Sequence, residues 1–171
     1  MANRREFLQG TIAVSALPLL SSATLAEFAT PAGAHALYKA VFDERSSASR
    51  AFANEMRARG IAVHAIKGDI TQLWYDDLHA RWTKDQSVVA GVTEAQALFC
   101  LERLSWDYQM RVVYRSEHTA TSNEIKIASI ADSIASVPRT APGVAVPLAS
   151  LRPNSLYAWV IAPVKRTSFI A

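Results

Sequence analysis

The sequence predicts an α/β domain in which helices cover both faces of a mostly parallel β-sheet of about five strands. Short apolar runs alternate with segments of helical periodicity along residues 37–116, and the connections between them are short. Half of the 171 residues are hydrophobic, which is enough for one core and excludes a generally disordered chain. A single cysteine excludes a disulfide-stabilised scaffold.

Five apolar runs are expected to form the strands of this sheet. Each run is short, contains β-branched or aromatic residues, and is bounded by polar residues, glycine or proline. The runs comprise residues 37–42, 61–66, 87–92, 111–116 and 156–162. The alternation of strands with helices is similar to that of three-layer, doubly wound domains of the Rossmann or flavodoxin type.

Four segments have apolar residues at helical spacing. They comprise residues 48–59, 71–82, 94–109 and 125–137. Asp69 or Thr71 can cap the second helix, although its aromatic residues and adjacent aspartates also suit a structured loop. Thr93, followed three residues later by Gln96, resembles a capping box and is expected to cap the third helix. The β-branched content of the fourth segment makes it a weak helix former.

The N-terminus has the order of a secretory signal. A basic start is followed by the apolar run 11–20 and by the small residues 21–26. Within the basic start, Arg4 and Arg5 are followed by Phe7 and Leu8, a pattern that resembles the twin-arginine (Tat) signal. Cleavage after Ala26 is expected, and residues 32–34 form a second possible cleavage site.

This resemblance implies a protein that folds first and is then exported to the periplasm by the Tat translocase, its partner during export. Residues 1–26 are then the signal peptide, 27–36 a linker, and 37–171 a single α/β domain. The mature chain contains no other apolar run long enough to be a candidate membrane span. A net charge of +3 is too small to indicate a nucleic-acid partner.

Polar residues at the ends of the expected strands are the candidate ligand-binding residues. The carboxyl ends of parallel strands meet at one edge of a sheet, where α/β proteins bind their ligands. The candidates are Asp43, Glu44, Arg45, Asp69, Thr93, Glu117 and His118. Gly68 and Gly91 are expected to let a ligand approach the backbone there. The alternative is that these residues are polar only because loops are polar.

The sequence identifies no cofactor. It lacks the glycine-rich turns of dinucleotide-binding and P-loop sites. Asp76 and His79 are candidate metal ligands one helical turn apart, unless they lie on a solvated helix face. Cys100 is surrounded by apolar residues and is expected to be buried and inert.

Two functions fit these features. The first is an exported accessory or binding protein that binds a small molecule or a partner subunit of a redox complex. The second is a small periplasmic enzyme whose carboxylates and histidine act as general acid and base or hold a divalent metal. The residues that would do so are Asp43, Asp69, Glu117 and His118.

Overall fold

A computed structural model describes residues 36–119, 127–136, 152 and 155–164, all of which belong to one compact unit. The elements follow one another as β1 (Leu37–Asp43), α1 (Ser47–Ala58), β2 (Val63–Ile66), α2 (Thr71–Leu73), η1 (Trp74–Leu78), α3 (His79–Asp85), β3 (Val88–Glu94), α4 (Ala95–Trp106), β4 (Met110–Thr119), α5 (Ile127–Ser136) and β5 (Ser155–Pro163). All five expected strands and all four expected helical segments are confirmed, with small differences at their ends. The segment from α2 to α3 is one continuous helical run and not a structured loop.

The prediction of a mostly parallel sheet is wrong. The strand order is β2-β1-β3-β5-β4, and only β1–β2 and β1–β3 are parallel pairs. The last strand, β5, lies between β3 and β4 and is antiparallel to both. The sheet is therefore mixed and does not have the Rossmann or flavodoxin arrangement.

The burial of β5 explains why it lies inside the sheet. Eight of its nine residues are buried, from Ser155 to Ala162. A strand buried to this extent pairs with a neighbouring strand on each side and is covered on both faces. At the edge of the sheet, its backbone and part of its apolar surface would be exposed to solvent. The apolar run in the sequence indicates that this strand is buried, but it does not indicate whether the strand is parallel or antiparallel to its neighbours.

One consequence of the mixed order matters for the site. Because β4 is antiparallel to β5 and β5 is antiparallel to β3, the strands β1 to β4 all run in the same direction. Their carboxyl ends therefore lie at one edge of the sheet.

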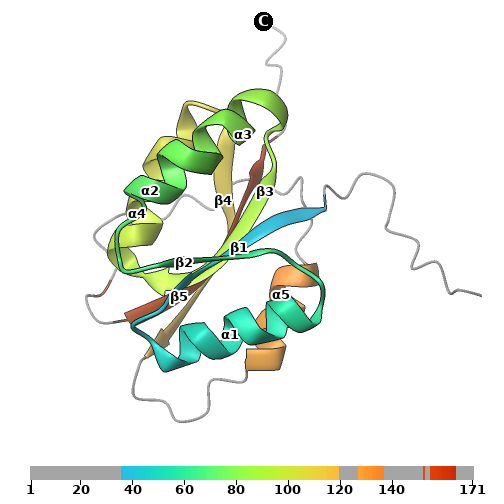
Figure 1. The fold of residues 1–171 in the computed structure, drawn as a ribbon, viewed down its shortest axis with the longest axis vertical. Helices are drawn as coiled ribbons and strands as arrows, with labels where there is room; N and C mark the ends of the chain where they lie inside the picture. The colour runs from blue at the N-terminus through green and yellow to red at the C-terminus, as the bar shows by residue number, and fades with distance from the viewer. Residues whose placement is uncertain (1–35, 120–126, 137–151, 153–154, 165–171) are drawn as a thin grey trace, which may run out of the picture. The chain divides into compact units, whose positions relative to one another are not determined.

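Helices cover both faces of the sheet (Figure 1). On one face, α1 and α5 pack together and contribute Phe52, Met56, Ile130 and Ile134 to the core. On the other, the α2–α3 run and α4 bury Leu73, Leu78, Trp82, Leu98 and Leu101 against the sheet. Within the described residues, no helix is both long and apolar enough to cross a membrane.

Gly91 has a structural role in this core and does not expose backbone to a ligand. It is buried in β3, next to Trp159 on β5. A Cβ at this position would lie 2.5 Å from Cζ2 of Trp159 and 2.7 Å from the carbonyl oxygen of Val41. The glycine makes room for the indole ring in the middle of the sheet.

Candidate functional site

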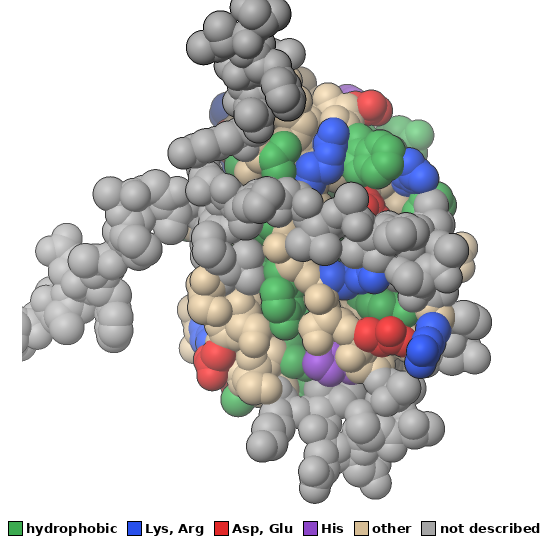
Figure 2. All heavy atoms as spheres, turned by 180° about the vertical axis from the view of Figure 1, so that it is seen from behind, with side chains coloured by type: hydrophobic (Ala, Val, Ile, Leu, Met, Phe, Trp, Pro, Cys, Tyr) green, Lys and Arg blue, Asp and Glu red, His purple; other side chains and the backbone are tan. Residues whose placement is uncertain are grey.

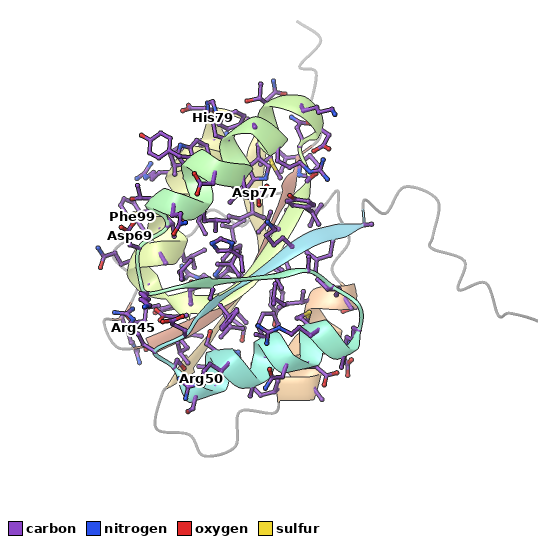
Figure 3. All side chains as sticks on the ribbon, viewed as in Figure 1. Arg45, Arg50, Asp69, Asp77, His79 and Phe99 are labelled. Carbon is purple, nitrogen blue, oxygen red and sulfur yellow. The ribbon has the colours of Figure 1, made fainter. Side chains whose placement is uncertain are left out.

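A pocket with a volume of about 650 Å³ opens at the carboxyl edge of the sheet. It lies between the α2–η1 segment and α4, on the face opposite α1 and α5. The connection after β1, the loop after β2 and one face of α4 form its walls (Figure 3). The lining residues are Arg45, Lys67, Gly68, Asp69, Ile70, Thr71, Trp74, Tyr75, Gln96, Phe99, Cys100, Arg103 and Leu104. This volume suits a small organic molecule.

The loop after β2 shapes one side of the pocket. Asp69 Oδ1 accepts hydrogen bonds from the backbone N–H of Thr71 (2.8 Å) and from its hydroxyl (2.7 Å), which fixes the start of α2. These two bonds hold the pKa of the Asp69 carboxyl below its ordinary value. Asp69 thus bonds to the first residue of α2, but the N-cap position itself is taken by Ile70, without a side-chain cap; the Asp69 carboxylate remains exposed at the pocket.

Arg45 is held at the pocket by a buried carboxylate. Asp43 Oδ1 accepts hydrogen bonds from the backbone N–H of Arg45 (3.0 Å) and from Nε (2.9 Å), and Oδ2 accepts from Nη2 (2.6 Å). Burial by itself would raise the pKa of the Asp43 carboxyl. The hydrogen bonds and charge of Arg45 outweigh burial and hold that pKa below its ordinary value.

Two further neighbours fix the guanidinium of Arg45. Its Nη2 lies 3.0 Å from Oε2 of Glu94, an exposed ion pair at the end of β3. Gly68 lies against it with a φ of +85°, and a Cβ there would lie 2.5 Å from Nη2. Glycine is therefore required at position 68 both by the backbone conformation and by the close approach of the arginine.

The remaining wall of the pocket comes from α4. Gln96, Phe99, Cys100, Arg103 and Leu104 recur at helical spacing and share one face of the helix. Aromatic rings line the pocket on both sides: Phe99 comes from α4, and Trp74 and Tyr75 come from η1. Tyr75 is one of the two large hydrophobic side chains that are exposed among the described residues.

The prediction that Cys100 is buried is wrong. The thiol is only half-buried and lines the pocket. Its neighbours Ala97, Leu98 and Leu101 face the core, whereas Cys100 lies at the border of that face. Adjacent apolar residues along the sequence do not share one face of a helix, so the apolar run misled the prediction.

The structure brings only some of the predicted ligand residues together. Arg45 and Asp69 line the pocket, Asp43 positions Arg45, and the carboxylate of Glu44 pairs with the pocket residue Lys67 (3.2 Å). The other three candidates, Thr93, Glu117 and His118, are not among the lining residues.

Thr93 does not cap α4, contrary to the expectation from sequence. The helix begins after Glu94 without a side-chain cap. Thr93 is fully buried in β3, and its hydroxyl accepts a hydrogen bond from the indole N–H of Trp159 (3.0 Å). Its side chain is therefore buried in the core and is not available to cap the helix or to bind a ligand.

Glu117 and His118 lie on β4, separated from β3 by β5. The carboxylate of Glu117 accepts a hydrogen bond from the hydroxyl of Ser155 (2.9 Å). His118 is half-buried, and burial lowers the pKa of its imidazole. The insertion of β5 is the reason that these residues lie away from the pocket.

Asp76 and His79 are both exposed and lie on η1 and α3. The imidazole of His79 packs edge-on against Trp74, with 5.5 Å between ring centroids, and lies 6.2 Å from the ring of Tyr108. Among the described residues, no three His, Cys, Asp or Glu side chains gather as metal ligands would.

A second polar cluster forms where Asp77 contacts Tyr38 and Lys39 of β1, a set of contacts that the sequence did not predict. Asp77 accepts a hydrogen bond from the Tyr38 hydroxyl (2.7 Å) and forms an ion pair with Lys39. The guanidinium of Arg81 lies 4.2 Å from the centre of the Tyr38 ring. Figure 3 labels Asp77 on the helical run above the sheet.

Two backbone irregularities bring this cluster together. The pairing of β1 with β3 shifts between Leu37 and Lys39, so the usual alternation of side chains is interrupted and both Tyr38 and Lys39 contact Asp77. The facing helical run contains the π-helical turn η1, which includes Asp77. No sequence pattern indicates the bulge or the π-helical turn, so the contacts of Asp77 with Tyr38 and Lys39 could not be predicted from the sequence.

We expect the exchange Asp77→Asn to destabilise the fold by about 1–2 kcal/mol, because it weakens two partly buried hydrogen bonds to a charged acceptor. Asp76→Asn is the matched control, since Asp76 is exposed and no hydrogen bond or ion pair joins it to a described residue; it should change the free energy of unfolding by less than about 0.5 kcal/mol. Urea denaturation of both variants measures the difference. Equal effects would show that the cluster adds no stability.

On the face shown in Figure 2, the visible Lys and Arg side chains lie among hydrophobic and acidic ones instead of forming one continuous patch. The predicted signal residues Arg4, Arg5, Phe7, Leu8 and Ala26, together with residues 27–35 of the predicted linker, lie outside the described residues.

No protein-family model, curated protein or solved structure matches the chain.

Proposed function

We propose that the protein is exported to the periplasm by the Tat pathway and binds a small molecule there in the pocket at the carboxyl edge of the sheet. In this proposal it is a binding or accessory protein, and an exported redox complex is a suitable partner. The N-terminal sequence supports the export, and the pocket supports the binding.

The pocket is the observation that carries this proposal. It has the volume of a small organic ligand, and it combines apolar rings with a few charged groups. Its position matches the edge at which α/β sheets bind ligands, even though the sheet is mixed.

The enzymatic alternative receives less support from the geometry. It requires Asp43, Asp69, Glu117 and His118 to act together. Asp43 is fully buried and bound to Arg45, and Glu117 and His118 lie on β4, beyond β5. Asp69 alone exposes a carboxylate to the pocket.

Exposed aromatic residues near the pocket support an accessory role with a protein partner. Trp106, at the end of α4, is 42% exposed. The guanidinium groups of Arg103 and Arg111 lie 4.2 Å and 5.4 Å from the centre of its ring. Tryptophan and arginine are enriched at the centres of protein interfaces.

Filling the pocket tests the binding proposal. Gln96 is exposed on the first turn of α4 and lines the pocket, so Gln96→Trp should block it without disturbing the core. Ala51→Trp places the same ring at an exposed position of α1, on the opposite side of the sheet, and is the matched control.

The uncharged fluorescent dye phenylnaphthylamine serves as the probe. We expect the wild-type protein and the Ala51→Trp variant to bind the dye with similar affinity, and Gln96→Trp to bind it at least about tenfold more weakly, because the ring occupies the apolar volume. Absence of binding by the wild type, or equal binding by both variants, would contradict the proposal.

A further inference from the structure

The pocket carries more positive than negative charge. Among its described lining residues, Arg45, Lys67 and Arg103 are cationic, and Asp69 is the single carboxylate. The three cations differ in how far other groups of the protein already neutralise them.

Arg45 and Lys67 have partners within the protein. Arg45 is paired with Asp43 and Glu94, as described above. The Nζ of Lys67 lies 3.2 Å from Oε1 of Glu44. An anion that approaches either group therefore competes with a carboxylate that is already in place.

Arg103 forms no hydrogen bond or ion pair with a described residue, and its guanidinium packs against aromatic rings instead. The neighbouring carboxylate of Glu102 interacts with its charge without forming an ion pair. The central carbon of the Arg103 guanidinium lies 5.4 Å from the centre of the Phe99 ring and 4.2 Å from that of Trp106. Stacking on rings holds the planar group in place while leaving its N–H donors available.

The apolar part of the pocket lies next to this guanidinium. Phe99 precedes Arg103 by one helical turn, Leu104 follows it directly, and Trp74 and Tyr75 lie on the opposite wall. A ligand that places a flat ring among these side chains brings a substituent on that ring near Arg103.

We infer that the pocket recognises anionic aromatic compounds, in which a planar ring bears a carboxylate or a similar oxyanion. Arg103 donates hydrogen bonds to the oxyanion in a planar, two-pronged geometry. The aromatic and aliphatic side chains cover the ring, and the excess positive charge around Arg45 and Lys67 adds a weaker, solvent-screened attraction. This inference rests on the proposed binding function and specifies its ligand class.

Cys100 allows a direct test, because it is the only cysteine of the chain and lines the same pocket. Its thiolate attacks an aromatic disulfide and releases one coloured thiolate, while the other half of the reagent remains bound to the sulfur. Two such reagents differ in charge: dithiobis(nitrobenzoate) bears a carboxylate on each ring, and dithiodipyridine is uncharged. The rate of each is divided by its rate with free cysteine, so that intrinsic reactivity cancels.

We expect the normalised rate of the anionic reagent to exceed that of the neutral one by about two- to fivefold at low salt, the range of an exposed ion pair. Raising the salt concentration to about 0.5 M should remove most of this preference by screening. Arg103→Gln should remove most of this anionic preference and leave only the smaller contribution of Arg45 and Lys67. Arg57→Gln is the matched control and should leave the preference unchanged, because Arg57 is also stacked on a ring, 5.3 Å from the centre of Phe42, but on α1.

The outcomes separate this inference from the proposed function. If Gln96→Trp slows the neutral reagent but the wild type shows no anionic preference, the pocket binds small molecules and the inferred ligand class is wrong. An anionic preference that is undiminished in Arg103→Gln would likewise overturn the role of Arg103. If Gln96→Trp slows neither reagent, the thiol is reached by another route and the pocket itself is not the binding site.

Discussion

Exchanging Arg4 and Arg5 for lysines is expected to keep the protein in the cytoplasm. The Tat pathway recognises the arginine pair itself, so a pair of lysines with the same charge does not replace it. Cell fractionation followed by detection of the precursor and the mature chain measures the result. We expect the periplasmic form to disappear and the precursor to accumulate.

Two controls make this result specific. Lysine exchanges at Arg50 and Arg57, which are exposed on α1, should leave the periplasmic yield unchanged. A strain without the Tat translocase should behave as the variant does. Normal periplasmic yield from either the variant or that strain would contradict the assignment of a Tat signal.

Asp43→Ala is expected to lower the free energy of unfolding by about 2–3 kcal/mol. The exchange removes a fully buried carboxylate that accepts three hydrogen bonds from Arg45. Breaking a buried ion pair costs more where the remaining charge is also buried. Here Arg45 is half exposed and keeps Glu94 as a partner, so we expect a value near that of charged hydrogen bonds.

Glu94→Ala is the matched control for this change. It removes the other carboxylate that pairs with Arg45, but this pair is exposed to solvent. Its removal should therefore cost less than about 1 kcal/mol. Urea denaturation of the two variants gives the comparison, and equal losses would mean that burial adds nothing to the Asp43–Arg45 pair.

The same pair gives the stability a defined dependence on pH. The pKa of Asp43 is lower in the folded protein than in the unfolded chain, where it has its ordinary value of about 4. Its contribution is therefore complete at neutral pH and is lost as the pH falls below about 4 toward the folded-state pKa. The difference in stability between wild type and Asp43→Ala should shrink over that interval, and a constant difference would show that the charge of Asp43 is not involved.

The positions of the helices and strands were determined by the sequence alone. Apolar residues at the spacing of a helix or strand record which side of each element is buried, and this information is local. The hydrogen bond from Thr71 to Asp69 at the start of α2 is local for the same reason, since it joins residues two positions apart. The arginine pair and apolar run of the predicted signal are also local features.

The tertiary structure alone decided the order and direction of the strands. The apolar run of β5 shows that it is buried, but burial is the same whether the strand is parallel or antiparallel to its neighbours. Its insertion beside β4 placed Glu117 and His118 away from the pocket. The sequence prediction placed the residues at all strand ends in one site, and nothing in the sequence indicated that β5 would lie between β3 and β4.

The chemistry of the pocket also depends on contacts between distant residues. Gly68 lies against Arg45, and Phe99 of α4 lines the same pocket as Tyr75 of η1, although these residues are far apart in the chain. The exposure of Cys100 follows from which face of α4 the sheet leaves uncovered. Sequence patterns identify a buried face, whereas the shape of an opening depends on how two such faces pack against each other.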